Sequence, residues 1–222
     1  MEKLSHTEED YLKAIFRLTE RSRGLASTND IAKVMRTSAA SVSDMIQRLA
    51  RKEFFIYEKY HGVQLSSKGK TYAADLIRRE GLWKVFLHKT LSIPWDRISS
   101  ISEQLKHVRS EEMIQALDAH LGAPKFDPHG EAIPNAEGRF TLRNQNSLQL
   151  LNISDKARLV AVRNHDSEFL SYLSSLNLYI GAEIEVHQCF DFDHSKEIII
   201  DKMHKCVLTP KVCQELYVKP IH

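Results

Sequence analysis

Apolar positions in the first fifty residues recur at helical spacing. Thr7 and the acidic residues after it precede an apolar series, which predicts a capped helix over about residues 7–20. Ser27 begins a run, Ser-Thr-Asn-Asp, that starts a short second helix. Ser38 is placed to cap a third helix that runs to about Lys52. The apolar stripe of this third helix has the i, i+3, i+4, i+7 spacing of a buried face and consists of Val42, Met45, Ile46 and Leu49.

The pattern then changes from helical to β-rich. Residues 54–58 and 63–65 flank a turn that contains Gly62, and two short β-rich runs around such a turn predict a hairpin. Helix, short helix, tight turn, helix and hairpin is the element order of a winged helix-turn-helix domain. A generic α+β domain with the same order of elements is the alternative.

A long helix follows the hairpin, from a cap at Ser66 or Ser67 to about Phe86–Lys89. Residues 82–121 carry several apolar helical stripes, more than the winged domain needs, so they predict either a dimer interface or an ordinary helical core. The segment 122–134 is rich in Pro and Gly and is predicted to be irregular. Short β-rich runs from residue 148 onward, around a small helix at 168–176, predict a small β-barrel.

These patterns predict a mostly α protein with a small β part. We expect a winged helix-turn-helix domain at 1–75, a helical domain at 76–134, a linker at 135–147 and a small β-barrel at 148–222.

Composition and charge narrow the functional classes. The chain has 222 residues, no apolar run long enough to cross a membrane, and a polar N-terminus unlike a secretory signal, so we expect a cytoplasmic protein. Three cysteines without a CxxC spacing are typical of free thiols. Residues 21–70 carry ten Lys and Arg residues against four acids, a net charge of +6, whereas residues 147–222 carry eight basic and ten acidic residues. The basic block predicts a polyanionic partner for the N-terminal part alone.

Double-stranded DNA is the partner that this pattern favours. Small residues at the start of the third helix permit close approach to a groove, Gln47 is suited to adenine, and Arg48 is suited to guanine or phosphate. Hydroxyl groups of the helix-turn-helix are predicted to donate to phosphate, and Lys59 and His61 at the hairpin tip to reach a flanking phosphate or the minor groove. The predicted DNA-binding residues are Ser27, Thr28, Arg36, Ser38, Ala39, Ala40, Ser41, Ser43, Asp44, Gln47, Arg48, Lys59 and His61.

Enzymes and protein-interaction modules are the two other functional classes to which the sequence could belong. Gly69-Lys70-Thr71 lacks the upstream glycine of a phosphate-binding loop, and the GxSxG and HExxH motifs do not occur, so an enzyme is not expected. The alternative that remains is a protein-interaction module without operator specificity.

The whole chain resembles the diphtheria-toxin-repressor and manganese-transport-regulator family of metal-sensing bacterial repressors. The residues that carry the resemblance are EEDYLKAIFRL at 8–18, ASVSDMIQRL at 40–49, IYEKYHGVQLSSKGK at 56–70, EGLWKVFL at 80–87, ISEQLKHV at 101–108 and PKFDPHGEAIP at 124–134. The resemblance implies a homodimer that binds a palindromic operator. It also implies that the helical domain at 76–134 serves dimerisation and metal sensing, and that residues 148–222 form an SH3-like (FeoA-like) barrel.

The same resemblance implies a site for Mn²⁺ or Fe²⁺, with Asp10, Glu80, Glu103 and His107 at ligand positions. Three positions depart from the family. Glu80 stands where the family has histidine, and Lys84 and Lys106 stand where it commonly has glutamate. A lysine ammonium has no lone pair to donate to a metal ion.

Three interpretations of this site stay open. The two lysines pair with Asp10, Glu80 and Glu103 and replace the ion, so that no metal is needed. Alternatively, Glu80–Lys84 and Glu103–Lys106 are ordinary surface pairs on helices. In the third interpretation, Asp10, Glu103 and His107 keep a reduced metal site.

The family resemblance also implies a second metal position that receives ligands from the barrel. His165 and Glu168 match that contribution, with Glu80 and Ser99 as partners and Lys84 as an unfavourable neighbour.

Overall fold

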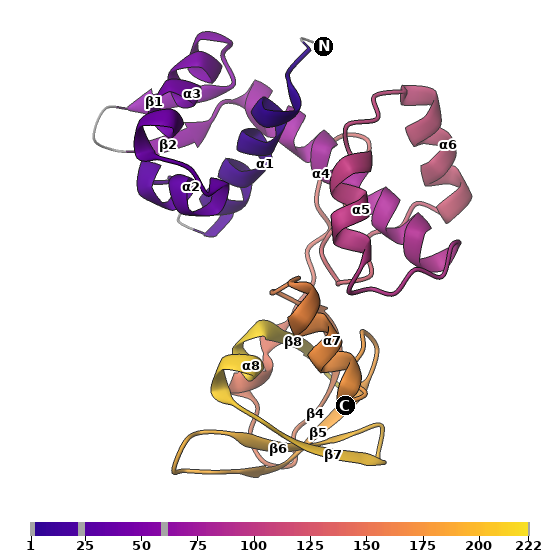
Figure 1. Ribbon diagram of the computed structural model, residues 1–222. Helices are drawn as coiled ribbons and strands as arrows, with labels where there is room; N and C mark the ends of the chain where they lie inside the picture. The colour runs from indigo at the N-terminus through magenta and orange to yellow at the C-terminus, as the bar shows by residue number, and fades with distance from the viewer. Residues whose placement is uncertain (1–2, 22–24, 59–61, 222) are drawn as a thin grey trace. The chain divides into compact units, whose positions relative to one another are not determined.

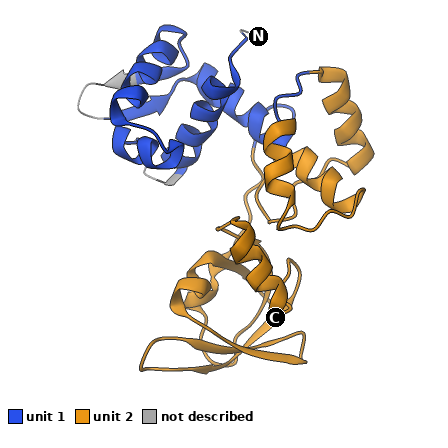
Figure 2. Cartoon of the chain, viewed as in Figure 1, with its two compact units in different colours: residues 1–80, 106–109, 134–139 blue, residues 81–105, 110–133, 140–222 orange. Residues whose placement is uncertain are grey.

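The computed structural model describes residues 3–21, 25–58 and 62–221. The chain forms two compact units (Figure 2), of which unit 1 comprises residues 1–80, 106–109 and 134–139 and unit 2 comprises residues 81–105, 110–133 and 140–222. Among the described helices, none is long and apolar enough to cross a membrane.

Unit 1 has the element order predicted from the sequence (Figure 1). Its elements are α1 (His6–Arg21), α2 (Thr28–Met35), α3 (Ala39–Arg51), β1 (Phe55–Glu58), β2 (Gly62–Leu65) and the first part of α4 (Ser67–Lys89). Both predicted serine caps are present, because Ser27 accepts a hydrogen bond from the backbone of Asp30, and Ser38 accepts one from Ser41. The winged helix-turn-helix prediction is confirmed.

The tight turn between α2 and α3 has a left-handed residue at its centre. Arg36 has φ of 50°, and its N–H closes the C-terminus of α2. The hairpin pairs Phe55 with Leu65, and Ala26 joins it through two backbone hydrogen bonds to Val63. The core between these elements contains Ile15, Ile31, Ile46, Leu49, Phe54 and Leu76.

Unit 2 begins with the second part of α4 and continues with α5 (Ile98–Leu105) and α6 (Glu111–Leu121). Ser110 caps α6 at its N-terminus, and Gly122, with φ of 73°, ends it.

The C-terminal part of unit 2 is a six-stranded antiparallel sheet with the order β3-β8-β4-β5-β6-β7, which confirms the predicted SH3-like fold. Its elements are β3 (Asn146–Ser147), η1 (Leu148–Leu150), β4 (Lys156–Val162), α7 (Ser167–Ser175), β5 (Glu183–Cys189), β6 (Lys196–Ile200), β7 (His204–Leu208), α8 (Pro210–Glu215) and β8 (Leu216–Pro220). The core is aliphatic and includes Leu159, Ile184, Ile198 and Val218.

Three details differ from the sequence expectation or extend it. Residues 146–147, expected in a linker, pair with β8. The helix α8 and the strand β8 were not predicted, although Thr209 caps α8 and Pro210 occupies its first turn. The expected domain boundary after residue 75 falls inside α4, and the domain limits themselves stay a prediction.

Within unit 2, the segment 127–131 joins the helices to the barrel. The carbonyl of His129 accepts a hydrogen bond from the N–H of Val162 in β4. Gly130 has φ of +83°, and a Cβ built there would lie 2.0 Å from the carbonyl oxygen of Val160. The backbones therefore approach so closely that only glycine fits at this position.

We predict that Gly130→Ala destabilises unit 2 much more than Gly122→Ala. Both glycines have positive φ, but a Cβ at Gly122 meets nothing within 4 Å. The Gly122 variant should cost about 1 kcal/mol in the free energy of unfolding for its strained backbone. The Gly130 variant should cost about 1–3 kcal/mol more, because the barrel has to move. Urea unfolding of both variants measures the difference, and equal costs would contradict the close contact.

Candidate nucleic-acid interface and buried ion pairs

Helix α3 separates into a buried face and an exposed face. Val42, Ile46 and Leu49 are buried in the core of unit 1. The opposite face is open to solvent and carries the predicted contact residues Ala39, Ala40, Ser41, Asp44, Gln47 and Arg48. Because the apolar stripe fixes the rotation of the helix, this polar face points away from the protein.

Several of the predicted hydroxyl donors already have partners within the protein. Ser27 donates to Asp30 at 2.6 Å, Ser43 donates to the carbonyl of Ala39 at 2.9 Å, and Ser38 and Ser41 share a hydrogen bond of 2.9 Å. Thr28 is half-buried, Arg36 is exposed, and the predicted contacts Lys59 and His61 lie outside the described residues. The DNA contacts of all these residues stay a prediction.

Glu8 of α1 contacts the C-terminal half of α3. Its Oε1 atom lies 2.7 Å from Lys52 Nζ and 3.1 Å from Arg48 Nε. Burial acts to raise the pKa of Glu8, but hydrogen bonds from Lys52 and the Ser5 backbone, with the charges of Lys52 and Arg48, bring the pKa below its usual value of 4.5. Sequence analysis interpreted the acids of α1 only as part of a capped helix start and missed this contact.

Lys106 forms one of the ion pairs that the lysine-replacement hypothesis requires. Its side chain is fully buried, and its Nζ atom lies 2.7 Å from Asp10 Oδ1. The backbone carbonyl of Lys106 accepts a hydrogen bond from Arg79 at 2.9 Å. The pair joins α1 to residues 106–109 across 96 residues of sequence.

Glu9, which sequence analysis did not single out, is the centre of a buried network beside this pair. It is 0% exposed and accepts hydrogen bonds from Tyr72 Oη at 2.8 Å and from Arg109 Nη2 at 2.9 Å. His107 Nδ1 also contacts Glu9, and His107 Nε2 lies 3.9 Å from Asp10. Burial and the bond to Glu9 raise the pKa of Tyr72 to about 12.

Glu80 has a lysine partner of its own that sequence analysis missed. Lys13 Nζ lies 2.8 Å from Glu80 Oε2, and both side chains are nearly buried. Lys13 lies one helical turn after Asp10 on α1, so its spacing on the same face was the available signal.

Lys84 pairs with two acids that were not among the candidates. Its Nζ atom lies 2.9 Å from Asp127 Oδ2 and 3.3 Å from Glu131 Oε2. Lys84 and Lys106 are 2% and 0% exposed, so the interpretation of these lysines as members of surface pairs is wrong. Asp127 and Glu131, which supply counter-charge to Lys84, lie 43 and 47 positions away in sequence.

The described residues do not show a ready metal site. Among them, no three His, Cys, Asp or Glu side chains are arranged to hold a metal ion. Asp10 and Glu80, two of the four expected ligands, each contact a lysine ammonium. Glu103 is half-buried. These positions fit a divalent ion poorly, and their role as ligands stays a prediction.

The second metal prediction involved His165 and Glu168. His165 lies in unit 2 with Nδ1 at 4.0 Å from Glu131 Oε2, and it lines a cavity together with Ser99. Glu168 is exposed in the first turn of α7. Their role as ligands also stays a prediction.

A winged helix-turn-helix with an exposed polar α3, a helical region and an SH3-like sheet together define a class of DNA-binding regulators. Models of three domain families match the chain. These are the N-terminal DNA-binding domain of the iron-dependent repressors at residues 3–63, their metal-binding and dimerisation domain at 66–135, and the FeoA domain at 146–220.

Curated relatives agree with these matches. The HTH-type transcriptional regulator MntR of Bacillus pumilus (strain SAFR-032) is 30% identical over 148 residues, which are 67% of this chain and 90% of the relative. MntR of Bacillus subtilis (strain 168) is 36% identical over 109 residues, 49% of this chain and 75% of the relative. The chain therefore belongs to the iron-dependent repressor family, whose members are DNA-binding transcriptional regulators.

Solved structures match nearly the whole chain. A manganese-dependent transcriptional repressor in complex with manganese is 27% identical with a TM-score of 0.86, covering 96% of this chain and 100% of that one. The apo form of the manganese-activated repressor ScaR is 29% identical with a TM-score of 0.78, over 96% and 100% of the two chains.

We predict that Glu8 makes the stability of unit 1 sensitive to acid. Its folded-state pKa lies below 4.5, so its contribution is complete above the unfolded-state pKa and is lost as pH falls through the folded-state value. Glu8→Gln should lower the free energy of unfolding by about 1.5–3 kcal/mol at pH 7.

Urea unfolding between pH 7 and pH 3 tests this expectation. The difference between wild type and Glu8→Gln should shrink as the pH falls below about 4.5. Glu111→Gln, at an exposed position of α6, is the matched control. A difference that stays constant over this range would refute the assignment.

Proposed function

We propose that the chain is a homodimeric repressor that inserts α3 of each protomer into the major groove of a palindromic DNA operator. The observation that carries the proposal is the exposed face of α3, which begins with small residues and continues with Gln47 and Arg48. Small residues permit close approach to base edges, whereas Gln and Arg are suited to adenine and guanine. Two symmetry-related copies of α3 require half-sites about 34–36 Å apart or a multiple of that distance.

The charge distribution supports DNA as the partner. Residues 21–70, which contain α2, α3 and the hairpin, carry a net charge of +6. Lys and Arg residues that neutralise phosphates release counter-ions, so binding should weaken steeply with salt. We expect the protein to act in the cytoplasm because its proposed partner is DNA.

We further propose that operator binding does not require a metal ion, although relatives are manganese-dependent. In unit 1, the acids Glu9, Asp10 and Glu80 contact Arg109, Lys106 and Lys13, respectively. Each of these three carboxylates is thus paired with a positively charged side chain of the protein itself. The Lys106 ammonium supplies a permanent link between α1 and residues 106–109 where a bound Mn²⁺ or Fe²⁺ would supply a reversible one.

Substitutions on α3 test the DNA interface. Arg48→Ala should weaken binding to an operator fragment selected from a random pool by about 1–3 kcal/mol and lower the salt slope by about 1. Gln47→Ala should relax base preference at one position of each half-site. Arg158→Ala is the control, since Arg158 is an exposed ion-paired residue of the barrel.

Gel shifts and fluorescence anisotropy at several salt concentrations provide the measurement. Unchanged affinity in both α3 variants, with wild-type unfolding curves, would favour the protein-interaction alternative over DNA binding. The Glu8–Arg48 contact makes the unfolding control necessary for the Arg48 variant.

Chelation tests the metal-independence. Wild-type operator affinity should be unchanged in EDTA, because Lys106 is part of the chain. Lys106→Glu should bind DNA only with added Mn²⁺, since its new carboxylate repels Asp10 until a cation joins the two groups. Lys106→Met, which removes the charge without adding a ligand, should bind the operator weakly with or without Mn²⁺.

Anisotropy with and without chelator, supported by circular dichroism of each variant, gives the answer. Loss of wild-type DNA binding in EDTA, with recovery on addition of Mn²⁺, would overturn the metal-independent mechanism while leaving the DNA-binding proposal intact.

A further inference from the structure

The ammonium group of Lys84 lies inside unit 2 among groups that are typical ligands of a cation. Lys84 is 2% exposed and lies between the carboxylates of Asp127 and Glu131, at 2.9 Å and 3.3 Å. Asp127 is positioned by backbone hydrogen bonds, since its Oδ1 atom accepts from the N–H groups of His129 and Glu131 at 2.9 Å each. The Asp127 carboxylate is therefore held in place beside the ammonium by the backbone of the same segment.

The imidazole rings of His129 and His165 stack on each other near the ammonium group of Lys84. The rings of His129 and His165 have centroids 4.5 Å apart at an interplanar angle of 23°, and the charge of Lys84 acts on both. His129 Nε2 contacts the carbonyl of Trp95 at 2.7 Å, and His165 Nε2 contacts the carbonyl of Val162 at 3.0 Å. A carbonyl only accepts hydrogen bonds, so each Nε2 carries the proton and each Nδ1 of the neutral ring keeps a lone pair.

The Nδ1 lone pair of His129 accepts no hydrogen bond from the described residues. Its Nδ1 atom is buried and has no hydrogen-bond partner among the described residues, whereas His165 Nδ1 lies 4.0 Å from Glu131 Oε2. A histidine whose other nitrogen is fixed by a backbone carbonyl is the usual arrangement of a metal ligand. Carboxylates and imidazoles are ligand types that divalent transition metals prefer. In the described residues these four groups are not arranged to hold a metal ion, and the cation beside the carboxylates is the ammonium of Lys84.

We propose that Lys84 permanently fills an interior cation site of unit 2, formed by Asp127, His129, Glu131 and His165, in place of a divalent metal ion. The proposal concerns this unit alone and holds whether or not α3 binds an operator. It differs from the sequence prediction, which placed Lys84 with other acids and named neither Asp127 nor Glu131.

The filled site lies where the helices of unit 2 meet the barrel. Lys84 belongs to α4, Asp127 and Glu131 to the connecting segment, and His165 to the loop after β4. The carbonyl of His129 accepts the N–H of Val162, and Arg143 donates to the carbonyl of Gly130 at 2.6 Å. The Lys84 ammonium thereby fixes residues 127–131, whose backbone hydrogen-bonds to β4 of the barrel.

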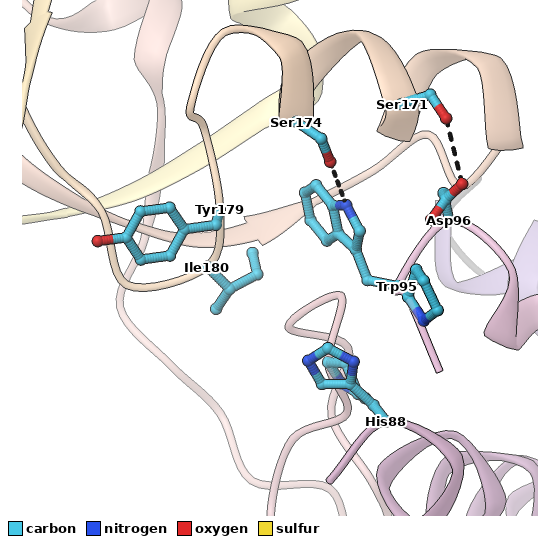
Figure 3. A pocket seen from close by; sticks show the side chains of 9 residues that line it. His88, Trp95, Asp96, Ser171, Ser174, Tyr179 and Ile180 are labelled. Carbon is cyan, nitrogen blue, oxygen red and sulfur yellow. Dashed lines mark hydrogen bonds between the residues drawn. The ribbon is translucent and has the colours of Figure 1, made fainter. Parts of the chain in front are cut away.

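A second set of hydrogen bonds connects the helices of unit 2 to the barrel without involving a charged lysine. Trp95 Nε1 donates to Ser174 at 2.8 Å, and Ser171 donates to Asp96 at 3.1 Å, beside a cavity of about 510 Å³ (Figure 3). Because these hydrogen bonds to α7 do not involve Lys84, we expect variants at position 84 to fold.

Cobalt titration tests the proposal, because Co²⁺ reports its own ligands through visible absorption. Wild type should show no Co²⁺ binding that depends on Asp127. Lys84→Glu, which exchanges the ammonium for another carboxylate, should bind one Co²⁺ per chain. Adding Asp127→Asn to Lys84→Glu is the matched control and should weaken that binding by at least about tenfold.

Two results would overturn the proposal. One is wild-type Co²⁺ binding that Asp127→Asn abolishes, which would mean that a metal displaces the lysine. The other is a folded Lys84→Glu protein that binds no Co²⁺, which would mean that the four groups do not converge on one position.

Hydrogen exchange gives a second measurement that does not depend on metal binding. Lys84→Met should speed exchange of the Val162 N–H, which bonds to the carbonyl of His129, while exchange in β6 stays as in wild type. Unchanged protection of Val162 in a folded Lys84→Met protein would show that the ammonium does not hold the segment 127–131, and this result too would overturn the proposal.

Discussion

The structure depends on buried lysine ammonium groups that are paired with carboxylates. Lys106 and Lys84 are 0% and 2% exposed, and transferring a charge out of water is unfavourable by several kcal/mol unless a close counter-charge compensates. Each ammonium therefore requires its carboxylate at hydrogen-bond distance. Because the partners come from distant parts of the chain, this requirement fixes α1 against residues 106–109 in one unit and α4 against 127–131 in the other.

A tethered ammonium and a bound metal ion stabilise a conformation in different ways. A metal stabilises the state that binds it in proportion to its free concentration, so the population of that state follows the metal. A lysine side chain is present at a constant effective concentration and carries one charge where a divalent ion carries two. Under the proposed mechanism, the ammonium groups of Lys106 and Lys84 take the place of a bound ion, so the active conformation no longer depends on the free concentration of metal. The family fold is kept, and the proposed change falls on its regulation.

The sequence predicted local structure well and long-range pairing poorly, for a physical reason. The caps at Ser27 and Ser38 and the apolar stripe of α3 act within a few residues, so composition and spacing were sufficient to find them. The partner of Lys84 lies 43 residues away and that of Lys13 lies 67 residues away. Nothing local distinguishes Asp127 from other acids, and only folding brings it to the lysine. The small α8 and β8 were missed because they are short and have weak periodicity.

The contact between Glu8 and Arg48 shows how the ion pairs of α1 reach the proposed DNA face. The Arg48 side chain is 61% exposed, and its Nε atom lies 3.1 Å from Glu8 Oε1. A guanidinium has five N–H donors in a planar fork, so the remaining donors are free to meet a phosphate or a guanine without breaking the contact. Glu8 thus holds the Arg48 side chain in one orientation. If Arg48 contacts DNA as proposed, this lowers the side-chain entropy lost on binding. Since Glu8, Glu9 and Asp10 are consecutive on α1, the helix that holds the Lys106 pair also orients a residue of α3, and anything that shifts α1 shifts the DNA face with it.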